Sequence, residues 1–251
     1  MTVAAMAATP PPVAVAPTHP VIELRQYKIV PGQRDAMISL FDREFVESQE
    51  VLGATIVGQF RDLDDPDRFV WIRGFPDMEQ RGEMLPAFYY GPVWQAHRDA
   101  ANPLLDDNDN VLLLRPAAAD LALPAPSGTR PEPGVTRPAD DVIVTTIFYL
   151  WKTPDSGFTA WFRDSLAPAL RKAGLPVLGG YVPEEETNNF PRLPVRDDKK
   201  VFVWFTRARD RAAYDHALAS LDRPIRAQLE AFNERPAQVL PLSPTDRSLL
   251  R

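Results

Sequence analysis

The sequence predicts an α+β protein made of two βαββαβ units whose sheets pack together as one α+β barrel. Three observations lead to this prediction. In the 251-residue chain, segments 21–116 and 141–245 show the same order of helix and strand signals. A proline-rich stretch separates them. The strands of both halves are apolar on both faces, whereas an antiparallel sheet with one wet face alternates cleanly between apolar and polar residues.

Helix and strand signals in the first half follow the order βαββαβ. Met37, Phe41 and Phe45 recur at a four-residue spacing that is typical of one helix face. Pro31-Gly32 marks the turn before that helix. The full pattern predicts strands at 22–29, 54–61, 68–75 and 110–114, a helix through 37–45, and a helical region over 78–101 interrupted near Gly91-Pro92.

The second half repeats this order, which indicates an internal duplication. Phe69-Val70-Trp71 recurs as Phe202-Val203-Trp204, and each copy is followed by a short turn and an aspartate, Asp77 or Asp210. The pattern predicts strands at 142–151, 177–182, 200–205 and 238–242, and helices over 158–173 and over 210–234 with a break at Pro224.

Each unit therefore matches the ferredoxin-like split βαβ pattern. In strand 142–151, one face carries Val142, Val144, Phe148 and Leu150, and the other carries Ile143, Ile147, Tyr149 and Trp151. Both faces need a cover. Helices cover one, and we expect the second sheet to cover the other. The barrel could close within one chain or between chains, and two independent, separately dimerising domains are the alternative.

Two segments are expected to lie outside the folded units. Residues 1–20, which include His19, form a Pro/Ala-rich tail that we expect to be disordered. Residues 117–140 read as a proline-rich linker, ordered poorly or only by packing on the surface, where a protease should cut first.

Composition excludes several classes of protein. A net charge of −6, from 34 acidic and 28 basic residues, argues against nucleic-acid binding. No apolar run is long enough for a membrane helix, so we expect no membrane partner. The absence of cysteine removes disulfides and thiolate metal sites and fits a reducing, cytoplasmic location.

The first half carries a set of motifs that resembles a known family. GluLeuArg at 23–25, FVESQE at 45–50, GQFRDLDDPDRFVWIRGFPD at 58–77, FYYGPVWQAHRDAAN at 88–102 and DNVLLLRP at 109–116 together resemble the NIPSNAP family. The resemblance covers residues 21–116, and the second half is similar to the family only in outline. It implies the dimeric α+β barrel superfamily, which contains cofactor-free monooxygenases, small isomerases and haem enzymes, and it implies a homodimer or higher homo-oligomer.

The densest group of candidate catalytic residues follows Gly91-Pro92. Trp94, His97 and Arg98 fall on one side of a helix. His97 could act as a general base and Arg98 could hold an anionic oxygen. In the alternative interpretation, His97 is a packed helix residue bonded to a backbone carbonyl, and Arg98 pairs with Asp99 or Asp106.

Strand positions add candidate binding residues. Phe69, Trp71, Arg73 and Phe75 share one face by the two-residue period, and Val57, Gln59 and Arg61 share one face of the preceding strand. Arg61 and Arg73 could bind an anionic ligand. Alternatively they form ion pairs with Glu23 or with the aspartates at 62–67. Glu47 and Glu50 are interpreted as solvated helix charges.

These residues predict a protein that binds a small organic molecule in an aromatic cavity between the first sheet and segment 89–102. The predicted substrate-binding residues are Arg61, Arg73, Trp71, Tyr89 and Trp94. The leading hypothesis is a cofactor-independent monooxygenase or isomerase with His97 as base and Arg61, Arg73 or Arg98 as anion clamp. Its alternatives are a non-catalytic binding or interaction module, and a haem enzyme with His216 as axial ligand. We expect no cofactor and no metal site in the leading case.

Overall fold

The computed structural model describes residues 19–251. Residues 1–18 of the predicted tail therefore lie outside the described part of the chain. The first half contains β1 (Val21–Ile29), α1 (Arg34–Leu40), the π-helical turn η1 (Phe41–Phe45), α2 (Glu47–Glu50), β2 (Thr55–Asp62), β3 (Arg68–Phe75), α3 (Met78–Tyr89), α4 (Pro92–Ala101), the 3-10 turn η2 (Asn102–Leu104), β4 (Leu105–Asp107) and β5 (Val111–Pro116). The linker contains the 3-10 turn η3 (Ala119–Leu121). The second half contains β6 (Val142–Leu150), α5 (Phe158–Trp161), the π-helical turn η4 (Phe162–Leu166), α6 (Ala167–Lys172), β7 (Val177–Pro183), β8 (Val201–Ala208), α7 (Arg211–Ala219), α8 (Arg223–Phe232) and β9 (Asn233–Pro244).

Local sequence signals set the helix boundaries in the same way in both halves. The Asp77 carboxylate accepts a hydrogen bond from the Gln80 amide at 2.7 Å and caps α3. Asp210 caps α7 by the equivalent bond from Ala213, also at 2.7 Å. Gly91 lies between α3 and α4. A larger residue does not fit there, because its Cβ would lie 2.3 Å from a backbone carbonyl oxygen of α3. The duplicated turn and aspartate therefore have a structural function as helix caps.

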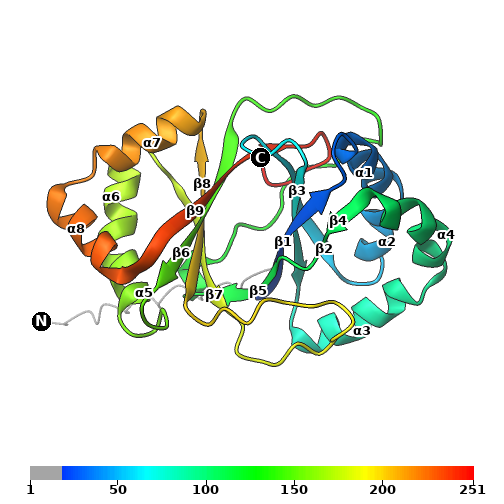
Figure 1. Ribbon diagram of the computed structural model, residues 1–251, viewed down its shortest axis with the longest axis horizontal. Helices are drawn as coiled ribbons and strands as arrows, with labels where there is room; N and C mark the ends of the chain where they lie inside the picture. Colours follow the sequence, from blue (N-terminus) through cyan, green and yellow to red (C-terminus); the bar gives the residue numbers. More distant parts are fainter. Residues whose placement is uncertain (1–18) are drawn as a thin grey trace, which may run out of the picture.

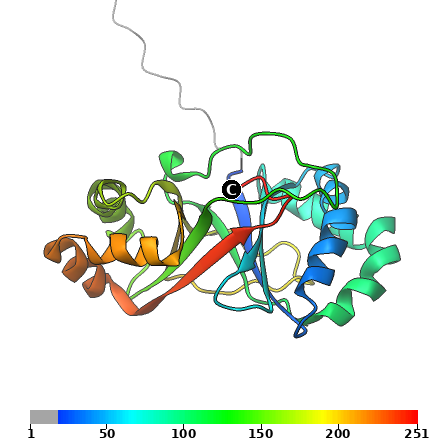
Figure 2. The ribbon, with the colours of Figure 1, turned by 90° about the horizontal axis from the view of Figure 1, so that it is seen from above.

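Eight strands form one closed antiparallel barrel, as predicted. Around the barrel the strand order is β1, β3, β2, β9, β6, β8, β7, β5 and back to β1. Two seams join the halves: β2 pairs with β9 and β5 pairs with β7. Figure 1 shows the strands crossing between a helical layer from each half, and Figure 2 shows the same arrangement from above. The barrel thus closes within one chain, and the predicted homo-oligomer stays a prediction.

Apolar side chains from both sheets fill the barrel. The interior cluster contains Ile22, Leu24, Val57, Phe60, Val70, Ile72, Leu112, Leu114, Leu123, Ile143, Ile147, Tyr181, Val201, Val203, Phe205, Leu240, Leu242 and Leu250. On β6, the two apolar faces divide as predicted, since Val144 and Phe148 pack under the helices and Ile143 and Ile147 point into the barrel. The prediction that Trp151 belongs to an apolar face of this strand was wrong, because Trp151 lies beyond the end of β6 and is 57% exposed.

A β-bulge overturns the predicted face of Val57. The register between β2 and β3 shifts between Ile56 and Gly58. Val57 consequently packs in the barrel interior, whereas Gln59 lies on the helix side and donates to Asp42 at 2.9 Å. The two-residue period failed here because the extra residue of a bulge moves the preceding side chains to the opposite face.

The linker is attached to the barrel more closely than its composition indicates. Leu121 and Leu123 are buried, and the Leu123 amide donates to the Tyr181 hydroxyl at 2.8 Å. Further along, Arg130 forms an ion pair with Glu50 at 2.6 Å. The green chain that crosses the top of Figure 2 is this segment.

The C-terminal segment is also held against the first half. Arg247 is 3% exposed and forms an ion pair with Glu47. Glu47 is exposed, as its interpretation as a solvated charge expects, whereas Glu50 is only partly exposed. Each glutamate also has a distant arginine partner that a sequence pattern cannot indicate. Among residues 19–251, no helix combines the length and the apolar character required to cross a membrane.

Candidate functional site

A pocket of about 350 Å³ lies between the outer face of the first sheet and the helices of the first half. Aromatic and aliphatic side chains make its inner wall: Tyr27, Met37, Phe41, Phe45, Trp71, Phe88 and Tyr89 are all buried. Its rim is polar and exposed, with Arg98, Asp99 and Arg192. This size and this combination of an apolar interior with a few polar groups are typical of small-molecule sites.

The structure brings four of the predicted site residues together around this pocket. They are Trp71 from β3, Tyr89 from α3, and Trp94 and Arg98 from α4. The rings of Tyr89 and Trp94 pack edge to face with centroids 5.0 Å apart. The predicted location between the first sheet and segment 89–102 thus contains a real cavity.

The two other predicted arginines do not line the pocket. Arg73 is fully buried behind it and pairs with Glu23 at 2.6 Å. Arg61 lies at the surface of β2 and pairs with Asp35 at 3.0 Å. Arg73 therefore forms the ion pair with Glu23 that was the alternative to ligand binding. Arg61 also forms an ion pair, but with Asp35, a partner that the sequence did not indicate.

His97 stands beside the pocket and not among the residues that line it. Its Nε2 atom is 3.2 Å from a carboxylate oxygen of Glu44, and both side chains are about one-third exposed. The imidazole packs against Phe45, with ring centroids 6.3 Å apart, and Phe45 belongs to the pocket wall. Next to it, the Arg98 guanidinium lies 3.6 Å from the Asp99 carboxylate.

The remaining histidines lie apart from this pocket. His216 is exposed on α7, where Tyr214 and Ala217 provide the buried side of the helix. His19, which was assigned to the tail, is 8% exposed and packs against Gly74 at the end of β3. Within the part of the chain that the structure describes, no cluster of three or more acidic or histidine side chains could hold a metal ion.

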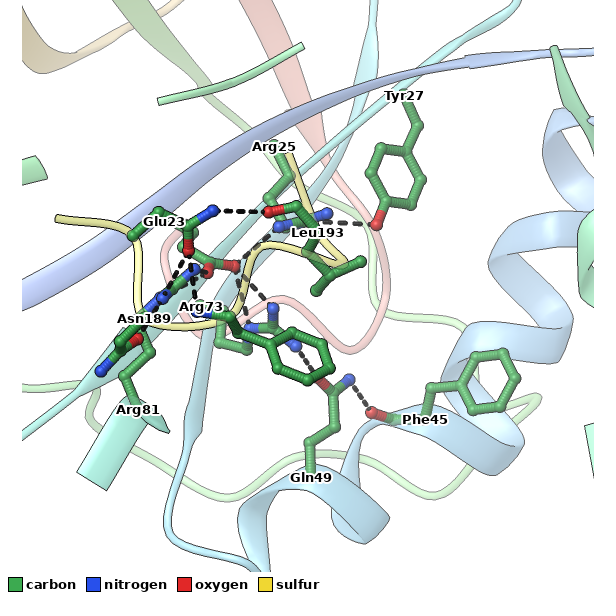
Figure 3. A network of polar contacts seen from close by, with 11 residues as sticks. Glu23, Arg25, Tyr27, Phe45, Gln49, Arg73, Arg81, Asn189 and Leu193 are labelled. Atoms are coloured by element: carbon green, nitrogen blue, oxygen red, sulfur yellow. Dashed lines mark hydrogen bonds and ion pairs between the residues drawn. The ribbon is translucent and has the colours of Figure 1, made fainter. Parts of the chain in front are cut away.

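Behind the pocket floor, one glutamate is surrounded by three arginines (Figure 3). The Glu23 carboxylate lies 2.8 Å from Arg25, 2.6 Å from Arg73 and 2.7 Å from Arg81. All four side chains are at most 1% exposed. Arg73 also donates to the side-chain amide oxygen of Gln49 at 2.6 Å. The three arginines and one glutamate give this buried cluster a formal net charge of +2.

The charges inside this cluster are strongly coupled. Burial alone would raise the pKa of Glu23, but Arg73, Arg25 and Arg81 outweigh burial and hold it far below its ordinary value of 4.5. Burial alone would lower the pKa of Arg25, but Tyr27 and Glu23 outweigh it and raise the pKa above its ordinary value of 12.5. Glu23 and Arg25 therefore both stay ionised at neutral pH.

A loop from the second half completes the site. The segment between β7 and β8, yellow in Figure 1, reaches across to α3. The side-chain amide oxygen of its Asn189 accepts a hydrogen bond from Arg81 at 2.6 Å, and Phe190 stacks on Tyr89 with ring centroids 5.9 Å apart. Arg192 and Leu193 then line the pocket. Sequence reasoning missed this loop because it approaches α3 from more than 100 residues away.

Sequence reasoning also missed Tyr27, although a signal was present. Glu23, Arg25 and Tyr27 alternate along β1 on the face that packs under the helices. Polar residues with this period on an otherwise apolar strand require buried partners. Applied to 22–29, that rule would have identified the face of β1 that forms the pocket floor.

Comparison with known proteins agrees with this division into halves. The NIPSNAP family model matches residues 22–119. Residues 22–119 are a NIPSNAP domain. This NIPSNAP domain supplies most of the pocket, and the β7–β8 loop outside it supplies the rest. A comparison with curated proteins gives no match.

Solved structures share the whole two-unit fold. A protein from Lactobacillus acidophilus NCFM, described as a "putative monooxygenase", is 11% identical, with a TM-score of 0.55, and the alignment covers 90% of this chain and 94% of that one. A protein of the same description from Fusobacterium nucleatum is 10% identical, with a TM-score of 0.57 and coverages of 90% and 93%. A NIPSNAP domain protein from Burkholderia xenovorans is 21% identical over 39% of this chain and 95% of its own, with a TM-score of 0.36.

Proposed function

We propose that this protein binds a small aromatic molecule with an acidic group in the pocket of its NIPSNAP domain. The observation that carries the proposal is the pocket itself, whose wall offers stacking surfaces from Trp71, Tyr89 and Trp94. At the rim, Arg98 and Arg192 provide two positive charges against the single negative charge of Asp99. An aromatic ring would fill the interior while its anionic group stays at the rim.

The test uses 2-naphthoate and its neutral isostere 2-naphthamide as probes. Trp71 and Trp94 line the pocket, so tryptophan fluorescence reports binding directly. The wild type should bind naphthoate more tightly than naphthamide. The double variant Arg98→Gln/Arg192→Gln should lose roughly tenfold in naphthoate affinity, because two exposed charge contacts together contribute about 1.4 kcal/mol. The naphthamide affinity of the double variant should stay within about twofold of the wild-type value.

A matched control removes a charge elsewhere. Arg163 is exposed in the second half, where it pairs with Asp164 at 2.9 Å. Arg163→Gln should leave both affinities unchanged. A naphthoate loss in this variant equal to that of the double variant would show that only overall charge matters, and failure of the wild type to bind either probe would remove the proposal.

Oxidation of the ligand by dioxygen is the second candidate, and the His97 contact with Glu44 favours it. A carboxylate at 3.2 Å orients the imidazole beside the pocket wall, and because His97 does not line the pocket, it would take the ligand's proton through one bridging water. The chemistry would remove two protons and two electrons from an electron-rich aromatic ligand, with His97 taking the first proton. With 1,4-dihydroxy-2-naphthoate, loss of two protons and two electrons to one dioxygen molecule yields the quinone and hydrogen peroxide.

Oxygen uptake with this dihydroxynaphthoate tests the role of His97. Oxygen uptake with the wild type should be faster than the uncatalysed uptake in buffer. His97→Gln should reduce the enzymatic rate on the order of 100-fold. Its naphthoate affinity should change little, because His97 does not line the pocket. Equal uptake by both proteins would exclude His97 as the base, and a wild-type rate equal to that in buffer would leave only the binding function.

A further inference from the structure

Tyr27 lies on the same face of β1 as Glu23 and Arg25 of the buried charge cluster, and it also lines the pocket. It comes from β1 and is 7% exposed. Its ring meets Trp71 edge to face, with centroids 5.7 Å apart. Because the rim residues Arg98 and Arg192 are exposed while Tyr27 is buried, Tyr27 belongs to the floor of the pocket.

Arg25 determines how the Tyr27 hydroxyl can hydrogen-bond. The Arg25 Nε atom donates to the hydroxyl oxygen at 3.0 Å, and another nitrogen of the same guanidinium donates to Glu23 at 2.8 Å. A guanidinium has donors only, so the hydroxyl must accept from Arg25 and direct its own hydrogen elsewhere. Among residues 19–251, Arg25 is the only hydrogen-bond partner of this hydroxyl. The phenolic hydrogen therefore has no acceptor within this part of the chain.

The surroundings make this hydroxyl a strong donor to negative charge. Burial raises the pKa of Tyr27 to about 12, so the phenol keeps its proton at neutral pH. Arg25 at the same time polarises the O–H bond, and the cluster behind it has more positive than negative groups. A fixed donor of this kind in a dry site favours an oxygen that carries negative charge.

We propose that Tyr27 is a specificity-determining residue, whose O–H donates to a phenolate, enolate or carbonyl oxygen at the end of the ligand opposite its acidic group. The inferred ligand class is aromatic acids with an oxygen function on the far ring edge. The acidic group stays at the rim with Arg98 and Arg192, and the second oxygen reaches the floor. This inference rests on the proposed function and extends it by the second recognition point.

The experiment compares 6-hydroxy-2-naphthoate with 2-naphthoate, which has the same carboxylate but lacks the remote oxygen. The wild type should bind the hydroxylated probe about tenfold more tightly, since its phenolic oxygen can accept a hydrogen bond that 2-naphthoate cannot. In Tyr27→Phe this preference should disappear while 2-naphthoate affinity stays within about twofold. Tyr149→Phe is the matched control, because it removes a phenolic hydroxyl that does not line the pocket and that donates to Gln238 at 3.2 Å. This variant should keep the preference for the hydroxylated probe.

Each outcome separates this inference from the proposed function. If neither probe binds the wild type, the proposed function fails. If both bind equally, or if the preference survives in Tyr27→Phe, the role of Tyr27 is overturned while the pocket stands. Should Tyr27→Phe not fold, difluorotyrosine placed at position 27 keeps the ring and makes the phenol more acidic, and an unchanged preference in that protein would also overturn the proposal.

Discussion

Glu23→Gln is expected to destabilise the protein by about 4 kcal/mol, measured by denaturant unfolding. The substitution keeps the size of the side chain and removes its charge. Arg25, Arg73 and Arg81 would then remain buried without a counter-charge, each within 2.8 Å of a neutral amide. Removing one partner of a buried ion pair costs far more than the pair contributes on balance, because the remaining charges stay desolvated.

Asp35→Asn provides the matched control. The Asp35 carboxylate is 79% exposed and pairs with Arg61 at 3.0 Å, so its loss should change the unfolding free energy by less than about 0.5 kcal/mol. If Glu23→Gln were as stable as this control, the three arginines would not depend on Glu23 and the account of the cluster would be wrong.

The pH dependence of stability should change in the same variant. The folded pKa of Glu23 is depressed below its ordinary value of 4.5, so its stabilisation is complete above that value. It is lost as the pH falls below 4.5 towards the folded pKa. Wild-type stability should therefore decline in this acidic window, and the slope should be smaller in Glu23→Gln.

The isolated first half, residues 19–123, is expected not to form a folded monomer. Its sheet would expose the apolar face that contains Ile22, Leu24 and Ile72, which in the whole protein contacts the second sheet. Strands β2 and β5 would also lose their partners β9 and β7 and become open edges. Size-exclusion chromatography should show self-association or aggregation of this fragment.

The matched experiment cuts the full chain within 126–136 by an inserted protease site. Both halves are then present, and the two seams and the common core should hold them in one particle until denaturant is added. A monomeric 19–123 fragment that unfolds cooperatively would show that the first half is an independent domain and that the common barrel is not needed for its fold.

Much of the fold could be predicted because strand and helix signals are local. Strand β3 matches its predicted bounds, and the predicted break near Gly91-Pro92 separates α3 from α4. The apolar character of both faces of β6 required a second sheet, and that sheet is present. For the site, the aromatic residues of β3 and α4 were predictable because regular periodicity puts them on the side where a helix covers a sheet.

Contacts between distant parts of the chain were decided only by the tertiary structure. The bulge at Val57 reversed a face, the β7–β8 loop brought Arg192 to the pocket rim, and Arg73 received Glu23 as its partner instead of a ligand. Sequence alone determined that this is a duplicated α+β chain with an aromatic face in its first half. Tertiary structure decided which charges are neutralised internally and which face the pocket, because desolvation makes a buried charge depend on every group around it, and those groups come from both halves of the chain.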